Sequence, residues 1–554
     1  MIQPTPQRIT LISSAVLALS MASAKAAGPN VDAGALLHQT EQTLSPPRAK
    51  AKRTPRKAPP TQVVTPTDVT VQVRRFEFAG NALLSSDALR TALESFTNRP
   101  LTLAQLKEAA DAITNTYREA GWTVRAYLPK QEISQGVVIL QIVEAVFGSA
   151  TVVGQAPERI ESSSLVNMAH ALLPQGQAIH ANDIDRALLL MDDLPGINVT
   201  GHLTEGQRDG ETNLALSATD EALITGNATL DNQGSRSTGT DRLSVNLNFN
   251  SPARLGDALA LNALKTQGSD YQRLGYTVPV GYSGWRAGVH GSRLSYRVIT
   301  PEFEALNPHG TATTGGVDLI YPLLRSQLQN VNLALSYDSK RFDNTSNTIT
   351  TTYGIKVYNA TLSANQTDAW NGGGITNASV ALTSGDKSTD SRYTKLNLSL
   401  SRLQSLSDSL SLYASATTQV ANQNLDSSEK IYLGGPMGVR AYPASEAGGS
   451  EGHTLSLELR QRLDRNLTLS GFYDYGWIKV NHDNNVASPA APNDYLLQGY
   501  GVSLAWQASS TLDFKATLSQ RVGNNPAANT TTTGNDSDNT KKITRIWLSA
   551  GLAF

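Results

Sequence analysis

Residues 221–554 consist of short segments in which apolar and polar residues alternate, and the chain stops on an aromatic residue, Phe554. The segments 243–250, 331–338 and 396–401 show this alternation most clearly. A period of two places apolar side chains on one face of a strand and polar side chains on the other. In a soluble β-sandwich the apolar face packs on a second sheet, whereas in an outer-membrane barrel it meets lipid and the polar face lines the lumen. Cellular location and strand count must distinguish these two architectures.

The N-terminus indicates export. Arg8 is followed by the apolar stretch 9–22 and by Ala24-Lys25-Ala26, a small-x-small cleavage site. We therefore predict a secretory signal peptide over residues 1–26. No other apolar run reaches the roughly 18 residues that a transmembrane helix needs. The chain has no cysteine, and its net charge of −1 gives no bulk attraction for nucleic acid.

The number of alternating segments favours a barrel. Sixteen candidate strands begin near Thr225, Asp241, Ala258, Tyr271, Trp285, Gly310, Asn330, Thr352, Thr376, Lys395, Leu410, Thr454, Leu467, Leu496, Leu512 and Arg545. Membrane strands of roughly ten residues, joined alternately by short turns and long loops, fit this spacing. The long polar connections are 299–309, 421–453, 481–493 and 523–542. The sequence predicts a mainly β fold with a sixteen-stranded antiparallel transmembrane barrel over 221–554.

The last strand is apolar on one face and ends on Phe554. An apolar final strand with an aromatic terminal residue resembles the assembly signal of outer-membrane proteins. An even number of strands also returns the chain to its starting side of the membrane. We therefore assign Phe554 as a candidate assembly signal, which implies the barrel-assembly machinery as a partner during biogenesis and outer-membrane lipids as the final surroundings.

The region before the barrel contains two units with one plan, which is an internal repeat. Residues 71–146 read as strand, helix, helix and a hairpin, with strands over 71–78, 123–128 and 137–143. The long helix 103–120 carries apolar residues at three- and four-residue spacing and ends at Gly121. Residues 147–220 repeat the order, with helices over 157–171 and 184–193. The sequence predicts two small α+β domains with boundaries at 71, 146, 147 and 220.

Two short motifs lie in the predicted barrel. The loop 421–453 contains Gly438-Val439-Arg440-Ala441-Tyr442, and the thirteenth strand contains Phe472, Asp474 and Gly476. They resemble the Val-Arg-Gly-Tyr loop motif and the Phe-x-Asp-x-Gly wall motif of the superfamily that inserts and secretes outer-membrane proteins. One residue departs from the pattern, because Ala441 stands where the family has Gly. If that position needed a positive φ, alanine would cost about 1 kcal/mol relative to glycine.

The order of these motifs behind two small domains resembles the two-partner secretion transporters, the TpsB or ShlB/FhaC/HecB family. The two domains then resemble POTRA domains, the polypeptide-transport-associated modules of that superfamily. The resemblance covers essentially the whole mature chain. It implies a large secreted exoprotein of haemolysin or adhesin type as the partner. It also implies a location in the outer membrane of a Gram-negative bacterium, with the POTRA domains in the periplasm.

Strand parity adds a charge contact to the resemblance. On the predicted thirteenth strand Asp474 faces the lumen, and on the preceding strand Glu458 does so as well. Arg440 lies in a glycine-rich loop that is long enough to fold inward. We therefore expect Arg440 to contact Asp474, with Glu458 as a possible further partner, because a guanidinium fork matches a carboxylate.

The segment before the first domain divides in two. Residues 27–44 include a possible short helix over 32–44, and residues 45–70 form a proline-rich basic linker that cannot be helical. In the family such a helix plugs the barrel. The alternative is a tail without structure.

Residue constellations of the usual catalytic kinds do not stand out. Gly281-Tyr282-Ser283-Gly284 is one residue short of a nucleophile elbow, and Gly434 to Gly438 lacks the lysine of a phosphate loop. We expect no enzyme, no cofactor, no metal site and no nucleic-acid partner. The function we expect is secretion of an exoprotein without nucleotide hydrolysis. The alternatives are an assembly factor that inserts other barrels and a passive porin.

Overall fold

The computed structural model describes residues 32–44 and 70–554, except residues 134, 390, 491 and 527–534. The predicted signal peptide and most of the predicted basic linker lie outside the described residues. Among those described, no helix is long and apolar enough to cross a bilayer.

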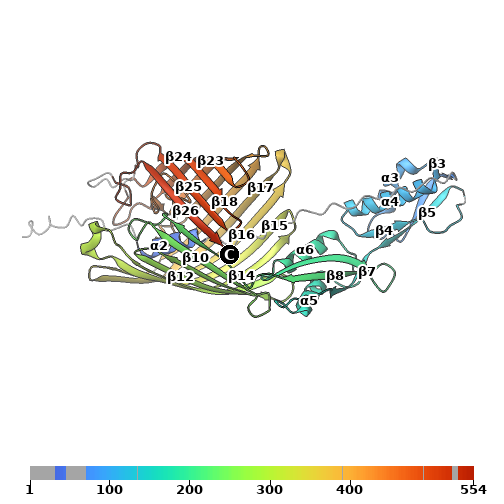
Figure 1. The fold of residues 1–554 in the computed structure, drawn as a ribbon, viewed down its shortest axis with the longest axis horizontal. Helices are drawn as coiled ribbons and strands as arrows, with labels where there is room; N and C mark the ends of the chain where they lie inside the picture. Colours follow the sequence, from blue (N-terminus) through green and yellow to red (C-terminus); the bar gives the residue numbers. More distant parts are fainter. Residues whose placement is uncertain (1–31, 45–69, 134, 390, 491, 527–534) are drawn as a thin grey trace, which may run out of the picture.

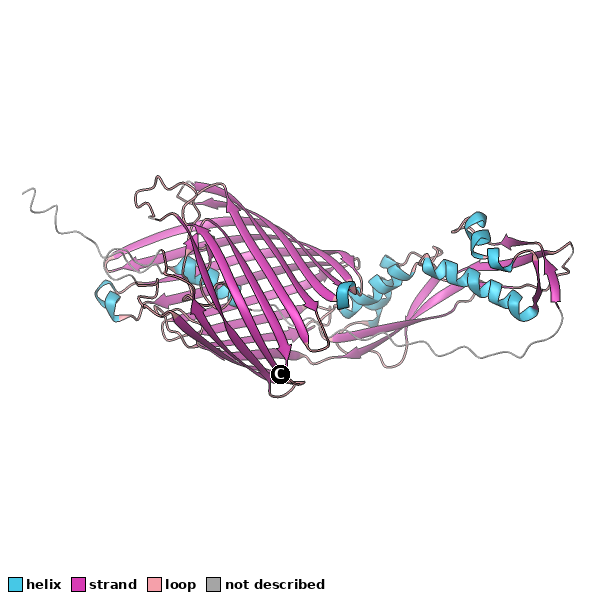
Figure 2. Ribbon diagram, turned by 90° about the horizontal axis from the view of Figure 1, so that it is seen from above, coloured by secondary structure: helices cyan, strands magenta, loops and turns pink. Residues whose placement is uncertain are grey.

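Sixteen antiparallel strands form one closed barrel (Figures 1 and 2), as predicted. They are β9 (Ile224–Asp231), β10 (Arg242–Asn250), β11 (Ala258–Lys265), β12 (Ser269–Val280), β13 (Trp285–Arg297), β14 (His309–Arg325), β15 (Gln329–Ser346), β16 (Ile349–Asp368), β17 (Gly374–Lys387), β18 (Ser391–Ser405), β19 (Leu410–Ala421), β22 (Glu451–Arg462), β23 (Leu467–Lys479), β24 (Asp494–Gln507), β25 (Leu512–Arg521) and β26 (Thr544–Ala553). The barrel closes where β26 pairs with β9 over five residue pairs, from Ser549↔Asp231 to Ala553↔Asn227.

Side chains alternate across the wall as the period of two requires. On β22, Leu455, Leu457 and Leu459 are 41–47% exposed on the outer face, whereas Glu458 between them is buried on the inner face. Phe554 is exposed on the outer face, and its main chain exchanges two hydrogen bonds with Gly226 (2.8 and 3.0 Å), which extends the seam by one residue.

The prediction of ten-residue strands is wrong for the middle of the barrel. Strands β14, β15 and β16 have 17, 18 and 20 residues. The prediction that every second connection is a long loop is wrong for the same reason. Strands β15 and β16 are joined only by residues 347–348, because the two strands stay paired up to Ser346↔Ile349.

The first α+β module contains β1 (Thr70–Val73), β2 (Arg75–Ala79), α3 (Ser86–Ala92), the short 3-10 helix η1 (Glu94–Phe96), β3 (Arg99–Thr102), α4 (Leu103–Glu119), β4 (Val124–Tyr127) and β5 (Val137–Glu144). Helix α4 begins with a capping box between Thr102 and Gln105. The single strand predicted over 71–78 is broken at Arg74, where the backbone N–H groups of Arg74 and Arg75 bond to Gly136. The segment before the break pairs with β3, a strand that the sequence analysis missed.

The second module repeats the plan with β6 (Val146–Val152), α5 (Ser162–Leu172), α6 (Ala181–Asp192), β7 (Ile197–Glu205) and β8 (Glu211–Asp220). Helix α5 starts five residues later than predicted and α6 three residues earlier. The module rests on one rim of the barrel. Arg325 at the end of β14 holds Asp193 with two hydrogen bonds (2.7 and 2.8 Å), and Arg186 of α6 donates to the Pro322 carbonyl at 2.8 Å.

Helix α2 (Ala33–Thr43) lies inside the barrel (Figure 1), within the range 27–44 where the sequence suggested a helix. Asp32 caps its N-terminus by accepting a hydrogen bond from the Ala35 amide. Its apolar face packs against inward-facing aromatic and aliphatic residues of the wall, among them Tyr271, Phe342 and Ile355.

Candidate functional site

The connection between β19 and β22, residues 422–450, folds into the lumen. It contains two short paired strands, β20 (Ile431–Tyr432) and β21 (Gly448–Gly449). Its apolar residues Leu433, Val439 and Tyr442 are fully buried against inward-facing Ile478 and Leu497 of the wall. Burial of this cluster explains why so long a loop adopts one conformation instead of extending into water.

Arg440 at the inner end of this loop contacts the barrel wall. Its Nε and Nη2 atoms each lie 2.8 Å from a different carboxylate oxygen of Asp474, and its backbone N–H donates to Asp474 at 3.1 Å. Nη1 reaches Glu458 at 3.1 Å. The predicted contact is therefore present, with both acidic partners engaged, and Asp474 is only 1% exposed.

Two further wall residues shape this contact. The guanidinium carbon of Arg440 lies 3.3 Å from the centroid of the Phe472 ring. At Gly476, an added Cβ would meet the Val439 side chain at 3.0 Å, so glycine lets the loop approach the wall closely. Phe472, Asp474 and Gly476 thus form one docking surface for residues 438–442.

The main chain of Arg440 is held from the other side. Its carbonyl oxygen accepts hydrogen bonds from Ser519 Oγ of β25 at 2.7 Å and from Trp547 Nε1 of β26 at 2.8 Å. The residue is thus bound by β22, β23, β25 and β26 together. An arginine in a forked, partly desolvated contact of this kind is costly to remove, since Asp474 would lose its cationic partner and Glu458 would keep only Arg460.

Comparison with known proteins identifies the family. The family model of the haemolysin secretion/activation protein ShlB/FhaC/HecB matches residues 210–505, and that of the ShlB-type POTRA domain matches residues 71–145. The chain belongs to the ShlB/FhaC/HecB family. It is an outer-membrane transporter of the two-partner secretion type.

Relatives agree with this assignment. The heme/hemopexin transporter protein HuxB of Haemophilus influenzae (strain 86-028NP) is 25% identical over 551 residues, which cover 94% of this chain and 96% of the relative. The outer membrane transporter CdiB of Dickeya dadantii (strain 3937) is 25% identical over 446 residues, covering 76% of this chain and 78% of CdiB.

Solved structures share the fold. CdiB from Escherichia coli has a TM-score of 0.69 at 19% identity and covers 95% of this chain and 99% of its own. BamA from Haemophilus ducreyi, lacking its first three POTRA domains, has a TM-score of 0.55 at 12% identity over 88% of this chain and all of that chain.

The departure at Ala441 has a structural explanation in this transporter. Ala441 does not have a positive φ, so the expected backbone strain is absent. Its methyl group instead points at the wall, where an added Cβ on Gly499 of β24 would lie 2.5 Å from it. The small residue of this contact therefore sits on the wall, and Gly499 makes the room that Ala441 needs.

The ShlB/FhaC/HecB loop of this chain has a second anchor, which the sequence analysis missed. Glu429 bonds Lys340 of β15 at 2.8 Å and Lys395 of β18 at 3.0 Å, and Asp426 bonds Lys387 of β17 at 2.8 Å. The loop therefore crosses the lumen from one wall to the other. The sequence did contain one indication of these contacts, because Lys340, Lys387 and Lys395 each occupy an inward-facing position of their strand.

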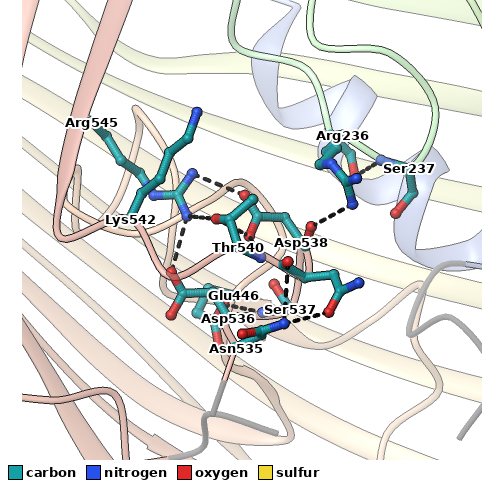
Figure 3. Close-up of polar contacts among 12 residues, drawn as sticks. Arg236, Ser237, Glu446, Asn535, Asp536, Ser537, Asp538, Thr540, Lys542 and Arg545 are labelled. Carbon is teal, nitrogen blue, oxygen red and sulfur yellow. Dashed lines mark hydrogen bonds and ion pairs between the residues drawn. The ribbon is translucent and has the colours of Figure 1, made fainter. Parts of the chain in front are cut away.

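A third set of contacts joins the loop to the C-terminal hairpin (Figure 3). Glu446 accepts hydrogen bonds from Asn525 and from the Ser537 amide at 2.9 and 2.8 Å. Asp536, beside Ser537, is bonded by Arg545 of β26 at 3.0 Å. Burial raises the pKa of the Glu446 carboxyl, and its two hydrogen-bond donors counteract only part of that rise.

Helix α2 of the transporter is fixed by both loop and wall. Ser427 donates to Asp32 at 2.7 Å and Ser445 donates to Gln39 at 2.8 Å, which ties each end of the loop to the helix. Tyr271 of the wall donates to Glu41 at 3.1 Å. The described residues contain no group of three or more acidic, histidine or cysteine side chains arranged to hold a metal ion.

Proposed function

We propose that this transporter exports one large exoprotein, which its two POTRA domains bind in the periplasm and which crosses the barrel lumen in extended form. The observation that carries the proposal is the loop 422–450. It enters a closed, polar-lined barrel from the rim opposite the second POTRA domain and is fixed to the wall at Arg440 and Glu429. The partner we propose for this chain is a class of protein, a large secreted exoprotein.

The lumen is suited to a moving polypeptide. Its wall presents neutral amides that already bond one another, such as Asn330 with Asn365 at 2.9 Å and Asn397 with Gln419 at 2.8 Å. Such groups hydrate a passing chain without holding it at one place. Folding outside the cell then buries apolar surface of the exported protein, which opposes its return without nucleotide hydrolysis.

In this proposal Arg440 and Asp474 hold the loop in the conformation that transport requires. Helix α2 closes the lumen at rest and must leave it before a polypeptide can pass. Phe554 and the strand that it ends direct assembly of the barrel into the membrane, where the outer face then meets lipid.

The decisive experiment compares culture supernatants of a strain with and without this gene. Loss of one large protein from the medium, restored by the gene on a plasmid, is the expected result. If the supernatants are the same but other outer-membrane proteins fall in amount, the chain is an insertase and the proposal is wrong. Survival of export in the Arg440→Ala variant at normal membrane levels would contradict only the role of the loop contact.

A further inference from the structure

Strand β16 extends beyond its neighbour at the rim that faces away from the POTRA domains. Its pairing with β15 continues to Ile349↔Ser346, but its pairing with β17 begins only at Ile355↔Lys387. The opposite rim is the periplasmic one, because the β14–β15 connection there reaches the second POTRA domain through Gln327 and Asp185 (3.3 Å). Residues 349–353 therefore form a free strand edge at the cell surface.

The main chain along this edge is unsatisfied on one side. In the described residues, the first hydrogen bonds on the β17 side are those of Gly354 with Ser388. In an antiparallel ladder alternate residues direct their N–H and C=O groups to the same neighbour. About half of the main-chain groups of residues 349–353 therefore point away from β15 without a strand partner.

Two other overhanging edges of the barrel are capped at the first residue beyond the ladder. On β18, Asn422 accepts a hydrogen bond from the Thr394 amide at 2.8 Å and donates its own amide to the Thr394 carbonyl at 3.1 Å. On β26, the Asn232 side chain accepts a hydrogen bond from the Leu548 amide at 2.8 Å, and the Asn232 backbone N–H donates to the Leu548 carbonyl at 3.2 Å. Ser388 caps Gly354 of β16 in the same manner, at 2.9 Å in both directions. Beyond its cap, however, β16 runs on for the five residues 349–353, against 391–393 on β18 and 544–547 on β26.

The sequence of the β16 edge favours strand addition. Residues 349–353 read Ile-Thr-Thr-Thr-Tyr and are mostly β-branched, without the lysine, proline or bulge that protects an exposed edge. Ile349 is 68% exposed and Thr350 to Thr352 are exposed as well. An edge of this composition binds an extended polypeptide through its main chain, with little demand on the partner's sequence.

The edge also continues the wall on which helix α2 rests. Ile355 and Val357 of β16 pack in one cluster with Ala33, Leu36 and Leu37 of the helix. The helix itself lies against β13, β14 and β15, so a polypeptide that takes its place would pass along β15 and emerge beside the β15–β16 hairpin that carries residues 349–353. We infer that the free edge of β16 pairs with an extended segment of the exported protein as that segment reaches the cell surface, an inference that rests on the proposed function.

The absence of cysteine from the chain allows a direct test. Thr350→Cys places a single thiol on the free edge, and Thr394→Cys places one at the capped residue of β18 as a matched control. Living cells are labelled with a maleimide–benzophenone reagent and irradiated during secretion. The probe is the large protein that disappears from the medium when the gene is deleted. We expect an adduct with that protein from Thr350→Cys and at least about fivefold less from Thr394→Cys, the ratio that one backbone hydrogen bond represents.

A functional arm uses Thr352→Lys and Thr352→Pro, with Thr394→Lys as control, because Thr352, like Gly354, directs its main-chain groups away from β15. Lysine protects an edge and proline removes a donor, so export should fall about fivefold or more for each hydrogen bond lost, at unchanged membrane levels. Equal adducts from both thiols, normal export by the Thr352 variants, or disulfide-linked dimers of the Thr350→Cys transporter as the main product would overturn the inference. Deletion of the gene without loss of any exported protein would instead overturn the proposed function.

Discussion

At the scale of single residues, Arg440 joins four strands through one side chain and one carbonyl group. Its two carboxylate partners require the planar fork of a guanidinium, which a lysine ammonium does not provide. The contact fixes the loop and leaves strand pairing untouched. Substitutions at Arg440 should therefore separate transport from barrel assembly.

We expect Arg440→Ala and Asp474→Ala to abolish most export while heat-modifiable barrel levels stay near normal. Arg440→Ala leaves the buried Asp474 without its cationic partner, a local cost of roughly 3–5 kcal/mol, whereas Asp474→Ala removes the fork and leaves Arg440 with Glu458 alone. Arg440→Lys should also be defective. Arg460→Ala is the matched control, because Arg460 contacts Glu458 at 3.0 Å on the same wall but does not touch the loop. Export by Arg440→Lys equal to that of the wild type would show that charge alone is sufficient.

A second residue pair gives a reciprocal test. Gly499→Ala should impair export, because the new Cβ would lie 2.5 Å from the Ala441 methyl group and push the loop off the wall. Ala441→Gly should restore export in the Gly499→Ala background. Quantitative blotting of the exported protein measures both effects. A double variant as defective as Gly499→Ala alone would mean that the contact at 441 is not the cause.

At the scale of elements, helix α2 and the loop 422–450 hold one another. His38 of the helix lies near Lys340, Lys395 and Glu429 and packs 6.1 Å from the Tyr432 ring. Burial, followed by the nearby lysines, lowers the pKa of His38 from 6.5 to about 3. Although burial raises it, Lys395 and Lys340 lower the pKa of Glu429 to about 2, so that carboxylate stays charged at mildly acidic pH.

A lowered histidine pKa means that protonation favours the state in which the helix has left its site. The seated state is fully stable above the ordinary pKa of 6.5 and loses stability as the pH falls toward the lowered value. We expect single-channel conductance in planar bilayers to rise between about pH 7.5 and pH 5.5. His38→Asn should remove this dependence.

Deletion of residues 32–44 is the matched control for that experiment, since it should raise conductance at every pH. If the deletion leaves conductance unchanged, the helix does not close the lumen. If the deletion raises conductance but the conductance of the wild type does not change with pH, the His38 imidazole is solvated while helix α2 lies in the lumen.

The last strand carries an element-scale prediction of its own. Phe554 has its side chain on the outer face, and its main chain pairs with Gly226 of β9. The residue therefore contributes both to the outer apolar surface and to closure of the barrel between β26 and β9. Phe554→Asp should lower the amount of transporter in the outer membrane. Substituting exposed Phe514 of β25 by Asp tests whether any outward aromatic has the same effect. Equal membrane levels for Phe554→Asp and wild type would exclude a terminal assembly signal.

At the scale of the whole molecule, the POTRA domains and the barrel are linked through the second domain. Arg325, Arg186 and the main chain of residue 159 bond across that junction, whereas the first domain contacts the second through Thr123, Ala145 and Ile179. The first domain can therefore be removed without disturbing the barrel rim.

We expect deletion of residues 71–146 to leave a barrel that inserts normally but exports nothing, because the periplasmic binding surface is lost. Heat modifiability of the barrel and the content of the medium are the two measurements. Charge reversal at the junction between the second domain and the barrel, Asp193→Arg, should instead weaken the docking of that domain on the rim. Normal export by the deletion variant would restrict partner binding to residues 147–220.

Alternation of residue types, together with the strand count and the predicted signal peptide, was enough to predict the sixteen-stranded barrel and the inward direction of Asp474 and Glu458. Helical spacing and turn residues predicted the repeat of two α+β domains. These follow from local rules, because the parity of a strand decides which face a side chain occupies. The reach of Arg440 to Asp474 followed from the same parity together with the family motifs. The lengths of β14 to β16 did not, since polar alternation looks the same in the membrane and above it.

Only the tertiary structure decided which inward-facing residues meet across the lumen. The bonds of Glu429 to Lys340 and Lys395, the complementarity of Ala441 and Gly499, and the free edge of β16 all depend on strand stagger and on the path of a loop. Alternation does not specify stagger, because shifting a strand by two residues preserves every face while changing every neighbour. The sequence by itself therefore determined which side of the wall each residue occupies, and closure of the barrel decided its partners.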